Sequence, residues 1–148
     1  MCDPAEADVE YIRGWLTSPS DDTGVHLAAD DGSWEFLPYA TLAEQVRRVA
    51  RLLVERGVGC GHTVCVLMPT SHLCVATMFA VLAVGATLTP IAPRLFGSHE
   101  QYRRHLRGVL ESSQAERALP YHQHHADSQQ YAREAVGQSF PHRLGPIL

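Results

Sequence analysis

Cysteine and histidine residues gather in one short part of the chain, and these side chains readily bind metals or act as nucleophiles. Five lie between positions 60 and 74: Cys60, His62, Cys65, His72 and Cys74. Soft ligands at this density raise the hypothesis of a zinc site. However, no Cys-x-x-Cys pair is present, and Cys65 and Cys74 fall in segments that we expect to be buried, where a free cysteine serves as a small apolar filler. We therefore favour structural roles and keep a small zinc-binding protein as the less favoured alternative.

Nucleophilic catalysis and dinucleotide binding receive weaker support from the sequence. Ser71 stands beside His72, but adjacency in sequence does not place a base on a nucleophile, and no Gly-x-Ser-x-Gly motif is present. Gly57, Gly59 and Gly61 resemble part of a dinucleotide fingerprint, yet they follow an expected helix rather than a strand. The sequence therefore predicts no catalytic, cofactor-binding or metal-binding residue in this chain.

The charged residues exclude some functions. The net charge is −4, and all twelve basic residues are arginine, so a mechanism that needs a lysine from this polypeptide is excluded. No basic field indicates a nucleic-acid partner. Arg103, Arg104 and Arg107 could form a basic patch, although a solvated helix face is the simpler interpretation. Three histidines in the tail, His122, His124 and His125, could bind a transition metal adventitiously.

The segment from Thr41 to Pro93 carries the clearest structural pattern. Thr41 and Glu44 fit a capping box that starts a helix, whose apolar face is formed by Leu42, Val46, Val49, Leu52 and Leu53. Gly57 can take the left-handed conformation that closes a helix. This pattern predicts an amphipathic helix with one buried face.

A strand, a helix and a second strand follow. The run 64–68 is apolar on both faces, as in a central parallel strand, and Thr70 or Ser71 can cap a helix from about His72 to Val84. Gly85 stops this helix, and Thr87 to Ile91 forms the next strand. These lengths predict a right-handed βαβ crossover, and hence an α/β fold with a mostly parallel sheet.

The apolar residues 73–92 are numerous enough to span a bilayer, which is an alternative to the crossover. Gly85 and Pro90 interrupt this segment, and neither an aromatic belt nor a basic flank frames it. We therefore expect no membrane span.

Weaker patterns flank this central segment. We expect a helix around 5–16, a β-hairpin with strands at 25–29 and 34–37 around a turn containing Asp31 and Gly32, and a helix capped by Ser98 that ends near Ser112. The His/Gln-rich tail carries at most a marginal helix at 127–136. This gives three parts: a helix and loop over 1–24, a folded part over 25–119, and a poorly ordered tail over 120–148. The acidic, polar N-terminus does not resemble a signal peptide, so we expect a cytoplasmic protein.

Two stretches, FLPYATLAEQVRRVARLLVERGV and GHTVCVLMPTSHLCVATMFAVLAVGATLTPIAP, resemble the opening of the adenylate-forming superfamily, which includes acyl-CoA synthetases, luciferases and nonribosomal adenylation domains. The turn from Pro69 to Ser71 and the ending at Pro93 look most like fatty-acyl-AMP ligases, which supply acyl adenylates to carrier proteins in polyketide and lipid biosynthesis. The resemblance extends from Trp34 to about Ala118. It implies an N-terminal part of such a ligase, preceded by a hairpin and built as a partial three-layer α/β fragment.

The resemblance implies ATP- and Mg²⁺-dependent activation of a fatty or other carboxylic acid to an acyl adenylate. The phosphate loop, the acidic Mg²⁺ ligand, the ribose-binding aspartate and the catalytic lysine of the family lie downstream of the matched region, so none maps onto a residue of this chain. We expect a truncated portion that is inactive alone, folds marginally and has as partner the remainder of a ligase or an acyl carrier protein. The alternative is a noncatalytic interaction module that docks on a partner ligase through a sheet edge. The matched text stops near Leu119, where the family would place another strand.

Overall fold

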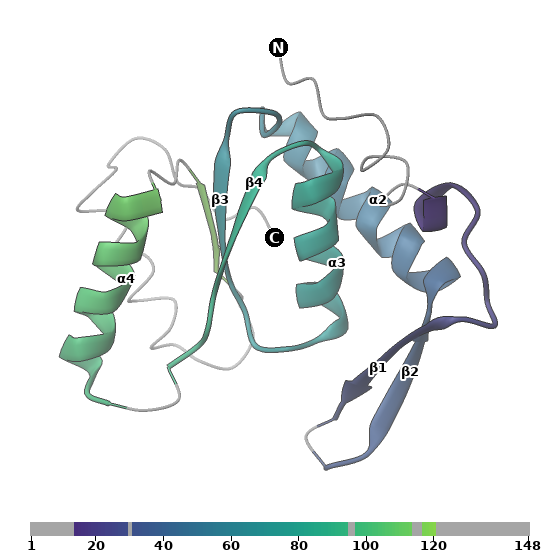
Figure 1. Cartoon of the computed structure of the whole chain (residues 1–148), viewed down its shortest axis with the longest axis horizontal. Coiled ribbons are helices and arrows are strands. Elements are labelled where there is room, and N and C mark those ends of the chain that lie inside the picture. The colour runs from purple at the N-terminus through teal and green to yellow at the C-terminus, as the bar shows by residue number, and fades with distance from the viewer. Residues whose placement is uncertain (1–13, 30, 95–96, 114–116, 121–148) are drawn as a thin grey trace. The chain divides into compact units, whose positions relative to one another are not determined.

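The computed structural model describes residues 14–29, 31–94, 97–113 and the backbone of 117–120. The chain forms two compact units, one from Met1–Cys60 with Thr70–Gly85 and the other from Gly61–Pro69 with Ala86–Leu148. The elements follow the order β1 (Gly24–Ala28), β2 (Trp34–Pro38), α2 (Tyr39–Glu55), β3 (Thr63–Leu67), α3 (His72–Ala83), β4 (Thr87–Ile91), α4 (His99–Ser113) and β5 (Arg117–Pro120) (Figure 1).

The first unit begins with the expected hairpin, which is confirmed. Strands β1 and β2 pair antiparallel, with Gly24 opposite Pro38 and Ala28 opposite Trp34. Gly24 lies so close to the backbone of Leu37 and Pro38 that a Cβ atom there would overlap the Leu37 carbonyl oxygen. The start of β1 can therefore hold only a glycine without moving the backbone.

Helix α2 begins earlier than the sequence predicts, so the prediction that Thr41 and Glu44 form a capping box is wrong. The helix starts at Tyr39 directly after Pro38, and no side chain caps it. Instead, the N–H groups of Tyr39 and Ala40 donate to the carbonyls of Thr23 and Ser20 at 2.8 and 3.0 Å. Backbone carbonyls from the segment before the hairpin thus satisfy helix donors that a local cap would otherwise serve.

Helix α2 packs along α3, which Figure 1 shows beside it. The buried residues of α2 are Leu42, Ala43, Val46, Val49 and Leu53, so the predicted apolar face is confirmed except at Leu52, which is only half-buried. Gly57 closes the helix at a φ of +73°, as expected. Residues 14–17 are helical, whereas positions 5–13 of the helix expected there lie outside the described residues.

Helix α3 is confirmed with Ser71 as its cap. The Ser71 hydroxyl oxygen accepts a hydrogen bond from the Cys74 N–H at 3.1 Å. The helix is apolar on nearly all sides, and Ala76, Thr77, Ala80 and Val81 are buried. In its second half the aromatic ring of Phe79 contacts Trp15 at a centroid distance of 5.0 Å, and the Trp15 and Tyr39 rings are 5.4 Å apart. The N-terminal segment is thereby attached to both helices.

The second unit is a three-stranded parallel sheet with the order β4-β3-β5. Thr63 lies opposite Thr87 and Leu67 opposite Ile91, so β3 and β4 are parallel and joined through α3, as the crossover requires. Pro90 lies inside β4 rather than ending it. A proline is tolerated there because β4 is an edge strand and needs no donor on its free side.

Strand β5 was not predicted from the residues themselves. It pairs parallel with β3, with Val64 opposite Arg117 and Leu67 opposite Pro120. The strand that the family would place near Leu119 is therefore present. The tail beyond it, including the helix expected at 127–136, lies outside the described residues.

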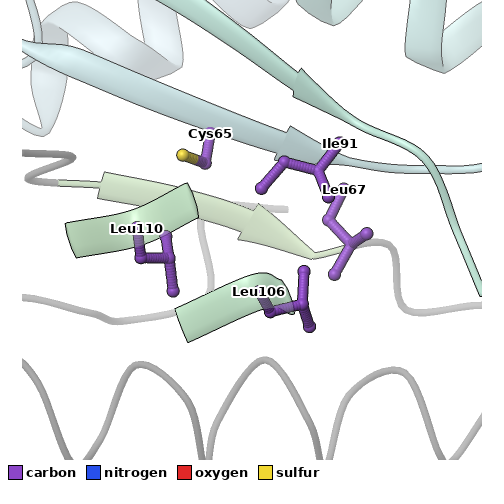
Figure 2. Packing of buried hydrophobic residues seen from close by; sticks show 5 residues of the cluster. All are labelled: Cys65, Leu67, Ile91, Leu106 and Leu110. Carbon is purple, nitrogen blue, oxygen red and sulfur yellow. The ribbon is translucent and has the colours of Figure 1, made fainter. Parts of the chain in front are cut away.

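Helix α4 covers the sheet on one face and is capped as predicted. Ser98 and Gln101 form a reciprocal cap, with N–H to side-chain oxygen distances of 3.0 and 3.2 Å. Five buried residues fill the space between helix and sheet: Cys65, Leu67, Ile91, Leu106 and Leu110 (Figure 2). The hairpin, the parallel sheet and the α/β class predicted from the sequence are confirmed. Among the described residues, no helix is both long and apolar enough to cross a membrane.

Candidate functional site

The cysteines and histidines of residues 60–74 do not form a metal centre within the described part of the chain. No group of three or more His, Cys, Asp or Glu side chains there comes together in a way that could hold a metal ion. Cys65 lies in the cluster under α4, and its Sγ atom is 3.8 Å from the Ser113 hydroxyl. The structure thus gives Cys65 the packing role that its apolar strand indicates.

The two free thiols in the described part of the chain, Cys65 and Cys74, are poor nucleophiles. Burial raises the pKa of the Cys65 thiol above its ordinary 9.0, partly offset by contacts with Ser113 and Thr89. Burial also raises the pKa of the Cys74 thiol, partly offset by a backbone hydrogen bond involving Ser71. Because the thiolate is the reactive form, both cysteines remain protonated and unreactive at neutral pH.

Ser71 and His72 do not form a nucleophile and base pair. The Ser71 hydroxyl caps α3, while the His72 Nε2 atom lies 3.3 Å from a carboxylate oxygen of Glu35 on β2. This pair meets the distance of an ion pair, but its geometry is not that of a hydrogen bond. The histidine therefore connects the hairpin to the first turn of α3 and is not aimed at the serine.

The basic residues of α4 are mostly exposed, as a solvated helix face requires. Arg104 and Arg107 are exposed, and Arg103 is half-buried with its guanidinium 3.3 Å from the Glu100 carboxylate. This spacing is an ordinary i, i+3 surface pair, which contributes little stability. The structure adds no phosphate-binding geometry to this helix.

The most unusual surface in the described residues is one face of the hairpin, which we call the outer face. It consists of His26, Ala28, Trp34 and Phe36, which share a side of the two paired strands and are all exposed. Trp34 is 70% exposed and Phe36 43%. The His26 ring lies against Phe36 at a centroid distance of 5.0 Å. The alternation of side chains along a strand places Trp34 and Phe36 on a common face, but the sequence does not identify that face as the exposed one.

The opposite face of the hairpin, the inner face, carries the residues that a core would use. Leu37 is buried, Val25 and Leu27 are half-buried, and both strands contact α2. Glu35, the charged residue of β2, also lies on this side, where it meets His72. Glu35 remains exposed there, so exposed side chains lie on both faces of β2 while Leu37 is buried on the inner face.

A family model for AMP-binding enzymes matches residues 17–142, which is most of the chain. This chain belongs to the AMP-binding enzyme family. The resemblance to the adenylate-forming superfamily drawn from the two sequence stretches is thereby confirmed. The match includes the hairpin, the helices and the parallel sheet.

Individual relatives agree with this assignment. A probable non-canonical nonribosomal peptide synthetase, CymA, from Salinispora arenicola is 41% identical over 64 residues, which are 43% of this chain and 1% of that protein. A chain from a structural study of fatty acyl-adenylate ligases from E. coli and L. pneumophila superposes with a TM-score of 0.70, at 18% identity over 89% of this chain. The McyG A-PCP structure with phenylalanyl-adenylate superposes with a TM-score of 0.69, at 12% identity over 94% of this chain.

These relatives are much longer than the chain. It spans 23% of the fatty acyl-adenylate ligase chain and 22% of the McyG chain. At such low identity the two superpositions establish the fold alone. The chain thus matches a limited part of these longer proteins.

Proposed function

We propose that this chain is the N-terminal portion of an AMP-forming ligase that activates a carboxylic acid to an acyl adenylate, and that it is inactive alone. The observation that carries the proposal is the AMP-binding match over residues 17–142. It is supported by the order of elements, because the hairpin, α2 and the β3–α3–β4 connection follow one another as the resemblance predicts. Residues 25–119 are the ligase part in this proposal, with 1–24 and 120–148 as flanking segments.

The described residues offer no assigned site for ATP or Mg²⁺. The chain has no lysine to bind phosphates, and its described residues include no cluster of acidic or histidine side chains that could hold a metal ion. We therefore assign no step of the adenylation to this chain. In our proposal the remainder of a ligase holds ATP and Mg²⁺, and this portion completes the fold around that site.

The substrate class follows less directly than the reaction class. The superposed fatty acyl-adenylate ligase favours a fatty acid, and CymA and the McyG structure with phenylalanyl-adenylate favour an amino acid. We propose a carboxylic acid of either kind, with a carrier protein as acceptor because the McyG structure is an A-PCP complex. A cytoplasmic location is consistent with this chemistry, which needs ATP.

A second candidate function is a noncatalytic interaction module that docks on a partner ligase. The observation that favours it is the exposed aromatic outer face of the hairpin, which differs from the sheet edge expected from the sequence. The zinc-binding alternative gains no support from the described residues. Stoichiometric zinc in freshly purified protein would revive it.

ATP–pyrophosphate exchange tests the proposal. The purified 148-residue protein is first shown to be monodisperse, and exchange is then measured with a panel of fatty acids and amino acids. An intact fatty acyl-adenylate ligase is the positive control, and a preparation from cells without this chain controls for host ligases. We expect no acid-dependent exchange above that background. Exchange that co-purifies with the chain would show that it holds an ATP site of its own and would refute its proposed inactivity.

A further inference from the structure

The outer face of the hairpin exposes apolar side chains to water. Its four residues include no Asp, Glu, Lys or Arg, and two of them are large aromatic side chains. Large apolar side chains are exposed at four described positions, Trp34, Phe36, Val54 and Leu82, and two of the four belong to this face. The Phe36 ring also lies against the His26 ring. Exposed apolar residues gathered on one face mark an interaction site more often than single exposed residues do.

The exposure of apolar residues on β2 points the same way. A hairpin with one solvated face normally directs its charged residues to solvent and its apolar residues to the core. Here Leu37 is buried on the inner face as expected, but the apolar Trp34 and Phe36 are exposed on the outer face. A two-stranded hairpin is marginally stable by itself, so a second covered face would contribute to its stability.

The size of the outer face decides which occupant fits. A stable interface between separate proteins uses roughly 20–30 residues on each side. Four residues are too few for a dimer of this chain to form through this face alone. An occupant that also continues the fold elsewhere is required, and about three-quarters of the superposed ligase lies beyond the 23% that this chain spans.

We propose that the outer face of the hairpin is the docking surface for the part of the AMP-binding enzyme that this chain does not contain. Trp34 is the anchor, and an uncharged, apolar recess on the other part of the enzyme receives its indole ring. Phe36 and His26, whose rings lie against each other, line one side of this contact. This inference rests on the proposed function, because it names the place where the two parts of that ligase meet.

Binding of a complementary ligase part tests this proposal. The probe is the fatty acyl-adenylate ligase that superposes on this chain, with the superposed segment deleted and its folding checked by circular dichroism. Its affinity is measured for the wild-type 148-residue protein and for Trp34→Ser, Phe36→Ser and Val54→Ser. Val54 is the matched control because it is 61% exposed but lies on α2, outside the hairpin. We expect Trp34→Ser to weaken binding about thirtyfold or more, as for an interface anchor, and Val54→Ser to change it less than about twofold.

The probe and this chain differ in most positions, so the separate parts can fail to bind even if the surface is correct. A fusion protein therefore provides the second measurement. In the fusion this chain replaces the superposed segment of the ligase, and oxidation of Trp34 by hydroxyl radicals is compared with that in the isolated protein. Strong protection of Trp34 in the fusion supports the proposal even if the separate parts do not bind. Equal oxidation in both, or equal binding of the wild-type and Trp34→Ser proteins, overturns it. Protection that appears in the isolated protein at high concentration also overturns it, in favour of a second copy.

Pyrophosphate exchange by the same fusion separates the two proposals. An active fusion with an unprotected Trp34 overturns the docking surface and leaves the proposed function intact. An inactive, folded fusion with a protected Trp34 supports the docking surface and counts against the proposed function.

Discussion

Replacing Thr77 by valine should stabilise the protein. Thr77 is fully buried in α3, and its hydroxyl oxygen has no hydrogen-bond partner among the described residues. A hydroxyl that loses water without gaining a partner costs about 1–3 kcal/mol. Valine has the same branched shape and a methyl group in place of the hydroxyl, so Thr77→Val removes this cost without opening a cavity.

We expect Thr77→Val to raise the free energy of unfolding by about 1–2 kcal/mol. This is the lower part of the 1–3 kcal/mol cost given above, because backbone carbonyls of a helix interact partly with a threonine hydroxyl. For a chain of this length this corresponds to a rise in the melting temperature of roughly 3 °C per kcal/mol. Urea unfolding followed by circular dichroism measures it, with equal slopes required for the two proteins so that the midpoints can be compared.

Two further variants show whether the hydroxyl is responsible. Thr41→Val makes the same change at an exposed position of α2 and should alter stability by less than about 0.5 kcal/mol. Thr77→Ser keeps the hydroxyl and removes the methyl group, and should destabilise by about 0.5–1.5 kcal/mol. A Thr77→Val protein that is less stable than the wild type would refute the reasoning, because it would mean that the buried hydroxyl is hydrogen-bonded in solution.

Two other predictions concern the second unit. Tyr102 donates its hydroxyl to the Ala92 carbonyl at 2.7 Å. Tyr102→Phe should therefore cost about 1 kcal/mol in urea unfolding, and an unchanged midpoint would show that water replaces this bond without loss. Burial raises the pKa of Cys65 in the folded state above its ordinary value of 9.0. The protonated thiol therefore contributes stability that is fully present at pH values below 9.0 and is lost as pH rises through the folded-state pKa. Stability should fall between pH 8 and pH 10 more in the wild type than in Cys65→Ala; equal falls in both would exclude Cys65 as the cause.

The sequence predictions of helix ends that were confirmed depend on only a few neighbouring residues. Ser71 and Ser98 cap their helices because a serine side chain needs only the N–H groups of the next turn. Gly57 closes α2 because only its own φ must become positive. The capping box at Thr41 failed because carbonyls of Ser20 and Thr23, distant in sequence, satisfy the first N–H groups of α2. The competing partner could not be seen from the four residues of the motif.

The candidate site could be predicted only in part. The sequence shows which residues of β1 and β2 share a face, because side chains alternate along a strand. It does not show which face meets α2, and Trp34 and Phe36 would ordinarily be assigned to the core on apolarity alone. Only the pairing of Glu35 with His72 and the burial of Leu37 identify the aromatic face as the exposed one.

The sequence by itself determined the family, the order of the elements from the hairpin to α4 and the absence of a lysine, since these depend on residue identity and local periodicity. The tertiary structure decided the start of α2, the existence of β5 and the exposure of the outer face. Strand β5 illustrates the reason: its four residues have no strand pattern of their own, and they form a strand because β3 offers its backbone hydrogen-bonding groups to them. Features that depend on a partner far away in the sequence become visible only when that partner is in place.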